Sequence, residues 1–135
     1  MNNYQVSADE KLIEEMIKPI ISSLEENDVS FKYIYQINLA LEEIFANISK
    51  YAYSDNKGII DISYEISENP KQLRVIIKDN GKDFDPLAKE DPNLNSSVQE
   101  RKIGGLGIYI VKNMVNDIKY QRINGENVLE FTKLL

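Results

Sequence analysis

Apolar residues recur along this chain at two spacings, and the spacing predicts which segments fold as helices and which as strands. Three segments carry apolar residues every three or four positions, the repeat of one buried helix face. Five shorter segments show the alternation or the β-branched runs that are typical of strands. The predicted helices cover residues 12–24, 34–52 and 107–115, and the predicted strands cover 4–6, 59–67, 73–78, 118–123 and 128–134.

Turn-forming residues separate these segments and predict how they connect. Asn69-Pro70 is expected to join two strands as a hairpin, and Asn124-Gly125 is a strong signal for a second hairpin. Pro19 conflicts with its surroundings, because a proline inside a helix removes a hydrogen bond and clashes with the preceding turn. It predicts either a kink or a helix that ends and restarts.

The order of the predicted elements is strand, helix, helix, hairpin, long irregular segment, helix and hairpin. Such an order places helices against one face of a sheet built largely from hairpins. We therefore expect an α+β two-layer sandwich, with helices covering one face of a mostly antiparallel mixed sheet. With 135 residues, the chain is expected to form a single domain, residues 1–135, around one hydrophobic core.

Composition excludes several kinds of chemistry. The chain has no Cys and no His, which removes disulfides, thiolate metal sites and the commonest zinc ligand. Its net charge of −6 argues against direct binding to nucleic acid, which needs a basic face, and against binding to an anionic membrane surface. No apolar run approaches the ~20 residues that cross a bilayer, and no signal-peptide pattern is present, so we expect a cytoplasmic location.

Two polar residues stand within the apolar stripe of the second predicted helix. Glu43 and Asn47 are four positions apart, which places them on the same side of the helix. A carboxylate and an amide one turn apart can orient a nucleophile and hold a hard cation through oxygen. Two solvated side chains beside a core stripe are the ordinary alternative for this segment alone.

A second polar group follows the predicted strand over 73–78. Asp79 lies where the strand gives way to a loop, and Gly81 follows two residues later. A buried carboxylate there can accept a hydrogen bond from the exocyclic amine of adenine, and a glycine lets the backbone approach the base. The alternative is a simple turn, because Asp-Asn-Gly is turn chemistry in any protein.

Glycines open the third predicted helix. Gly104, Gly105, Leu106 and Gly107 place free backbone N–H groups and the positive end of the helix dipole at one point, which suits an anion such as a polyphosphate. A flexible hinge or a tight helix entry is the alternative. The segment is not the phosphate loop of P-loop NTPases, because no Gly-Lys-Ser/Thr follows it.

The three motifs in this order resemble the nucleotide site of the GHKL ATPase/kinase superfamily, and the short chain is most similar to the bacterial anti-sigma-factor serine/threonine kinases. The resemblance spans about Tyr4 to Lys133. It implies bound ATP and Mg²⁺, with Glu43 as general base or orienting group and Asn47 as a metal ligand. It further implies that Asp79, with Gly81, reads the adenine amino group, and that the glycines of 104–107 bind the polyphosphate.

Residues 82–103 form a long irregular segment, which is more often functional than inert in a small domain. The resemblance implies that this segment is a lid over the nucleotide, and that Arg101, near its end, meets phosphate. Two solvated charges on a loop, at Arg101 and Lys102, are the alternative. The chain departs from the family pattern twice, with Tyr51 where many relatives have His and Asn127 near the position of a common Thr.

The resemblance implies a serine/threonine kinase that phosphorylates an anti-anti-sigma protein of the STAS type and, when free, binds a sigma factor. A homodimer is left open. One alternative is an ATP-binding partner switch with little or no phosphoryl transfer. Another is a detached histidine-kinase-like catalytic domain, although the chain lacks both a phosphoacceptor His and a dimerising helical hairpin. A purely structural domain is the remaining alternative.

Overall fold

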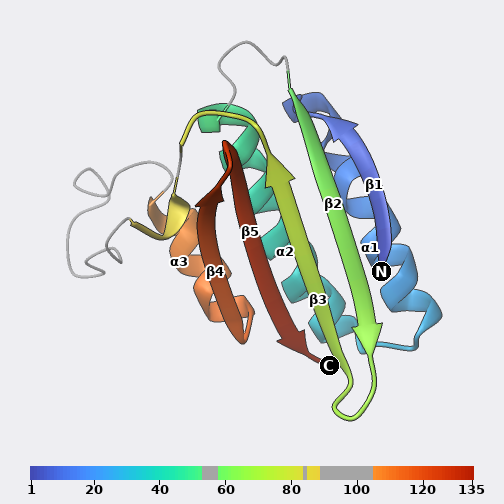
Figure 1. Cartoon of the computed structure of the whole chain (residues 1–135). Helices are drawn as coiled ribbons and strands as arrows, with labels where there is room; N and C mark the ends of the chain where they lie inside the picture. Colours follow the sequence, from blue (N-terminus) through green and yellow to red (C-terminus); the bar gives the residue numbers. More distant parts are fainter. Residues whose placement is uncertain (53–57, 84, 89–104) are drawn as a thin grey trace.

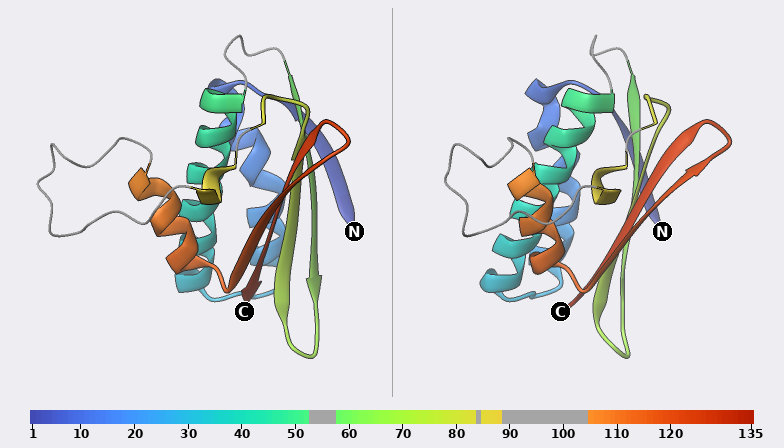
Figure 2. Two further views of the ribbon diagram at one scale, coloured as in Figure 1. Left: turned by 60° about the vertical axis from the view of Figure 1, so that its left-hand side comes forward. Right: turned by 90° about the vertical axis from the view of Figure 1, so that its left-hand side faces the viewer.

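The computed structural model describes residues 1–52, 58–83, 85–88 and 105–135, and these form two layers. One layer is a sheet with the strand order β1-β2-β3-β5-β4, and the helices lie together on one face of it (Figures 1 and 2). The strands are β1 (Asn2–Ser7), β2 (Ile59–Ser67), β3 (Gln72–Asp79), β4 (Asp117–Ile123) and β5 (Glu126–Leu134). The helices are α1 (Ile13–Glu26), α2 (Phe31–Asn47) and α3 (Gly105–Met114), with short helical segments at Glu10–Leu12, Ile48–Ala52 and Pro86–Ala88.

The expected two-layer sandwich is confirmed, and its sheet is antiparallel rather than mixed within the described strands. All four strand pairings, β1 with β2, β2 with β3, β3 with β5 and β5 with β4, are antiparallel. The chain leaves β3, returns through α3 to the edge as β4, and then turns back so that β5 inserts between β4 and β3. This route separates β3 from β4, which run in the same direction and would otherwise pair in parallel.

The core lies between the sheet and the helices. The alternating residues of the central strands point into it, and α2 contributes the largest buried set of any helix in the described part of the chain. Tyr4 and Val6 of β1 pack on its margin. The fully buried large side chains include Met16, Ile20, Leu24, Ile37, Leu41, Ile44, Phe45, Ile60, Ile62, Leu73, Ile77 and Phe131.

Helix α1 runs through Pro19 without a break, so the expectation that the helix ends and restarts there is wrong. A proline inside a helix costs about 3 kcal/mol. Burial of Met16, Ile17 and Ile20 around it, at about 1.5–3 kcal/mol for each fully buried side chain, outweighs that cost. The apolar stripe therefore overrides the local preference.

The second hairpin forms at Asn124-Gly125, as the sequence predicted. Asn124 and Gly125 both have positive φ, 51° and 80°, as a two-residue type I′ turn requires. This turn fixes the register of β4 against β5, so that Arg122 pairs with Asn127 and Ile118 pairs with Phe131. The register decides which β4 side chains share a face with the end of β3.

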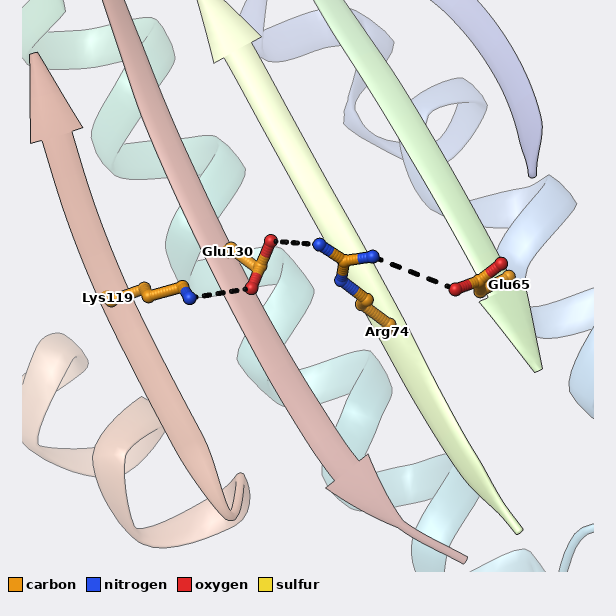
Figure 3. A network of polar contacts seen from close by, with 4 residues as sticks. All are labelled: Glu65, Arg74, Lys119 and Glu130. Atoms are coloured by element: carbon orange, nitrogen blue, oxygen red, sulfur yellow. Dashed lines mark hydrogen bonds and ion pairs between the residues drawn. The ribbon is translucent and has the colours of Figure 1, made fainter. Parts of the chain in front are cut away.

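The face of the sheet that the helices leave uncovered carries an ion network (Figure 3). Glu130 of β5 accepts from Arg74 of β3 at 2.8 Å and lies 3.2 Å from the Lys119 ammonium of β4. Arg74 also approaches Glu65 of β2 at 3.8 Å. Partial burial favours the protonated form of Glu130, but the hydrogen bonds from Arg74 and Lys119 outweigh it and hold the Glu130 pKa below its usual value.

This lowered pKa predicts an acid-dependent contribution to stability. A carboxylate whose folded pKa lies below its unfolded value of 4.5 stabilises the fold above that pH and loses the contribution as the pH falls through the folded pKa. Urea unfolding should therefore show the wild type more stable than Glu130→Gln at neutral pH and a much smaller difference at about pH 3. The variant Glu126→Gln, on the same strand but outside this network, is the control, and a pH-independent difference for Glu130→Gln would contradict the prediction.

Candidate functional site

The C-terminal half of α2 carries Glu43 and Asn47, one turn apart as the spacing predicted. Glu43 is half-buried, whereas Asn47 is only 7% exposed. Within the described part of the chain, the Asn47 Nδ2 atom is buried without a hydrogen-bond partner. A buried amide nitrogen without a partner normally costs about 1–3 kcal/mol, a cost that a bound water or ligand commonly offsets. The helix continues as a π-type turn from Ile48 to Ala52, a distortion that is frequent at functional sites.

The glycine-rich motif meets the Glu-Asn motif through tertiary packing. Helix α3 lies against α2 on the same face of the sheet (Figure 2). Gly107, in the first turn of α3, faces the Glu43 side chain so closely that a Cβ atom on Gly107 would stand less than 3.0 Å from Glu43 Oε2 and 3.2 Å from Glu43 Cδ. The absence of a side chain at Gly107 is therefore what leaves room for the Glu43 carboxylate.

The third motif lies at the end of β3. Asp79 alternates with the core residues Val75 and Ile77, so it points to the helix side of the sheet and is only 4% exposed. Its Oδ1 atom accepts from the Gly81 backbone N–H at 2.9 Å and from Asn127 Nδ2 at 2.9 Å. The bond to Gly81 is the turn expected from the alternative interpretation. Asp79 is therefore both part of this turn and buried, and the two features fix its carboxylate at the end of the strand.

All three motifs lie at one end of the molecule. The C-terminal end of α2 and the end of β3 both lie at the top of Figure 1, and the second views agree (Figure 2). Glu43, Asn47 and Gly107 form the helical side of this end. Asp79 and Gly81, also buried, form the sheet side.

Asn127, noted from the sequence only as a departure from the family pattern, is the direct partner of Asp79. The two residues pair across β3 and β5, and Asn127 is 4% exposed. Asn127 Nδ2 also donates to the Lys82 carbonyl at 2.7 Å. On its other side, Asn127 Oδ1 accepts from Arg122 Nη1 at 3.1 Å and from the Tyr120 hydroxyl.

Sequence reasoning missed Tyr120 and Arg122. Both belong to β4, and the Tyr120 hydroxyl also lies 3.0 Å from Asp83 Oδ1. Desolvation, then the hydrogen bond to Asp83, raises the pKa of Tyr120 to about 12, so the phenol stays protonated near neutral pH. A usable signal existed, because the Asn124-Gly125 turn fixes which β4 residues lie opposite Asn127.

Several predicted residues fall outside this description. Arg101 and Gly104, and most of the segment 82–103 that was expected to form a lid, lie outside the residues that the structure describes. Gly105 and Leu106 begin α3. The phosphate contacts predicted for these four residues stay predictions.

The described residues hold no cluster of three or more acidic, His or Cys side chains that could bind a metal ion alone. Across the same residues, no helix has the length and apolar character to span a membrane. A cavity of about 450 Å³ lies on the uncovered face of the sheet, lined in part by Ile76, Ile123 and Val128. It is on the opposite side from Asp79 and is not part of this site.

Comparisons with known proteins agree with the family resemblance seen in the sequence. A family model described as "Histidine kinase-like ATPase domain" matches residues 6–133. Relatives with 30% identity over 109 residues include proteins named serine-protein kinase RsbW from Bacillus cereus (strain AH820) and Bacillus anthracis (strain CDC 684 / NRRL 3495). Each alignment covers 76% of this chain and 67% of the relative.

Among solved structures, the histidine kinase domain from the Erythrobacter litoralis EL346 blue-light activated histidine kinase matches with a TM-score of 0.56 at 17% identity. The match covers 91% of this chain and 61% of that one. A second structure of the same kinase matches with a TM-score of 0.55 and is covered over 42% of its length. At this identity the likeness shows the fold.

Proposed function

The chain belongs to the histidine kinase-like ATPase domain family, as its resemblance to the GHKL superfamily predicted, and from that premise we propose that it is a Mg·ATP-dependent serine/threonine protein kinase that acts as an anti-sigma factor. The observation that carries this proposal is the contact of Gly107 with Glu43. It joins a polyphosphate motif to a candidate catalytic carboxylate, although the two are far apart in the sequence.

Asp79 is the proposed adenine-reading group. Its carboxylate is buried, and hydrogen bonds from Gly81 and Asn127 fix its position. A fixed carboxylate accepts a hydrogen bond from the exocyclic amine of adenine. Guanine carries a carbonyl oxygen at that position, which a carboxylate would repel.

Asn47 fits the role of a Mg²⁺ ligand. The Asn47 amide could rotate to point its oxygen toward a cation. This rotation would break no hydrogen bond of Nδ2 within the described residues, because that atom has none there. A single protein oxygen suits Mg²⁺, which keeps several waters and takes its other ligands from phosphate. When bound, the ion would neutralise charge on the transferred phosphoryl group.

Glu43 is the proposed general base. The hydroxyl oxygen of a substrate Ser or Thr forms a bond to the γ-phosphorus, the bond from that phosphorus to the bridging oxygen breaks, and ADP leaves. The hydroxyl proton passes to the Glu43 carboxylate. Little covalent chemistry is asked of the protein, so a positioned carboxylate and a row of backbone N–H groups suffice.

The proposed partners follow from similarity to the serine-protein kinases named RsbW. We infer that the substrate is an anti-anti-sigma protein of the STAS type and that a sigma factor binds the same chain in a competing complex. An ATP-binding partner switch with little phosphoryl transfer is the rival proposal. It would use Asp79 and the glycines in the same way and give Glu43 no role.

Nucleotide binding is the first test. Asp79→Asn is expected to weaken ATP binding by ~1–3 kcal/mol, because it disturbs a buried hydrogen-bond network and the acceptor offered to the base. Calorimetry with Mg·ATP and Mg·GTP on both proteins measures this loss and the preference of the wild type for ATP. The matched control is Asp61→Asn, on β2, whose Oδ1 accepts from Asn3 near the opposite edge of the sheet. Equal affinity of the wild type for ATP and GTP would contradict the assignment of Asp79.

A further inference from the structure

The edge strand β4 reaches into the proposed base pocket through one charged side chain. Arg122 lies near the C-terminal end of β4, just before the Asn124-Gly125 turn, and its Nη1 atom makes two hydrogen bonds. One goes to the Gly81 carbonyl at 2.8 Å, and the other goes to Asn127 Oδ1 at 3.1 Å. Gly81 and Asn127 both donate to Asp79 Oδ1. Arg122 therefore touches both supports of the Asp79 carboxylate.

Arg122 is one of the groups that determine which way the Asn127 amide points. A guanidinium has only donors, so the amide atom that faces it must be the oxygen. The amide nitrogen then faces Asp79 Oδ1 and the Lys82 carbonyl, both acceptors, at 2.9 Å and 2.7 Å. A flipped amide would set nitrogen against the guanidinium and oxygen against the carboxylate, so it is excluded by two repulsive contacts.

Tyr120 cannot replace Arg122 in this role. Its hydroxyl has one proton and lies between two acceptors, Asn127 Oδ1 and Asp83 Oδ1. Asn127 and Asp83 therefore compete for the Tyr120 proton. The cationic donor of Arg122 is the contact that holds the amide oxygen whichever acceptor the phenol serves.

We propose that Arg122 is a positioning residue that sets the preference of Asp79 for adenine, acting through Asn127 and Gly81. The inference rests on the proposed nucleotide binding. Without Arg122, the Asn127 amide oxygen loses its cationic donor, and the peptide at Gly81 loses its anchor. The two groups that donate to Asp79 Oδ1 are then held less rigidly, which weakens a bond from the adenine amine to this carboxylate more than it weakens contacts shared by all nucleoside triphosphates.

The experiment measures affinities for Mg·ATP and Mg·GTP by competition against a fluorescent ATP analogue. Arg122→Met keeps the length of the side chain and removes its donors, and it should weaken ATP binding about tenfold while GTP changes less, so that the preference for ATP falls. Arg122→Lys keeps one cationic donor and should recover part of the preference. Tyr120→Phe should weaken ATP binding less than Arg122→Met does, because the Tyr120 hydroxyl shares its one proton between Asn127 and Asp83.

The matched control is Arg74→Met, which removes an arginine from the ion network on the opposite face of the sheet. It should leave the preference for ATP unchanged. Arg122 is exposed, so Arg122→Met should fold, and its thermal unfolding midpoint is measured alongside. A wild type that binds no ATP overturns the proposed function and this inference with it. A wild type that prefers ATP, with Arg122→Met retaining that preference to within about twofold, overturns the inference alone.

Discussion

Glu43→Gln is expected to lower the rate of phosphoryl transfer by about 10²–10⁴-fold, the usual contribution of a positioned general base, while Mg·ATP affinity changes little. Glutamine has nearly the shape of glutamate, so the contact with Gly107 is kept. It cannot accept the proton of a substrate hydroxyl. Because the proposed role of the carboxylate is to act on the nucleophile rather than on the nucleotide, the effect should fall on the rate of transfer and not on binding.

The measurement is label transfer from γ-labelled ATP to a purified STAS-type antagonist, together with calorimetry of Mg·ATP binding. Glu42→Gln is the matched control. It neutralises the adjacent carboxylate of α2, which is exposed and accepts from Asn38 at 3.0 Å, away from Gly107. Transfer at the wild-type rate by Glu43→Gln would remove the catalytic role and favour the partner-switch alternative.

Much of the fold follows from local pattern. The three-and-four spacing of apolar residues identified α2 and placed Glu43 beside Asn47, since both relations depend only on helix geometry. The Asn124-Gly125 dipeptide identified the last hairpin, because its backbone needs positive φ at both positions. Pro19 shows the limit of such a pattern. A local rule predicted a kink or a break there, and the helix continues through the proline because burial of the surrounding apolar stripe outweighs its cost.

The site depends on contacts that no local pattern contains. Gly107 meets Glu43 only because α3 packs on α2, and Asp79 meets Asn127 only because β5 inserts beside β3. Family resemblance supplied the proposed roles of Glu43 and Asp79 but not the residues that hold these side chains in place. Arg122 lies on an edge strand in a polar context, so the strand pattern alone does not distinguish it from a solvated surface charge, and only the register set by the Asn124-Gly125 turn places it opposite Asn127.

Gly107→Ala is expected to raise the stability of the fold and to lower the rate of phosphoryl transfer. Gly107 lies within α3, where alanine is favoured over glycine by about 1 kcal/mol, so the variant should unfold at a higher temperature or urea concentration. The new Cβ would meet Glu43 Oε2, which is the free end of a flexible side chain and can rotate away at little cost. The fold is therefore kept, and the Glu43 carboxylate is displaced.

That displacement should lower phosphoryl transfer about a hundredfold, the effect of misplacing a catalytic group by ~1 Å. A double-mutant cycle identifies the cause. If Gly107 acts by making room for Glu43, Gly107→Ala should cost nothing further in the Glu43→Gln background, where the base is already absent. If Gly107 instead acts by binding phosphate, its substitution should weaken Mg·ATP binding in both backgrounds. Calorimetry and single-turnover transfer on the four proteins decide between them, and additive losses of transfer would exclude the proposed contact as the reason for this glycine.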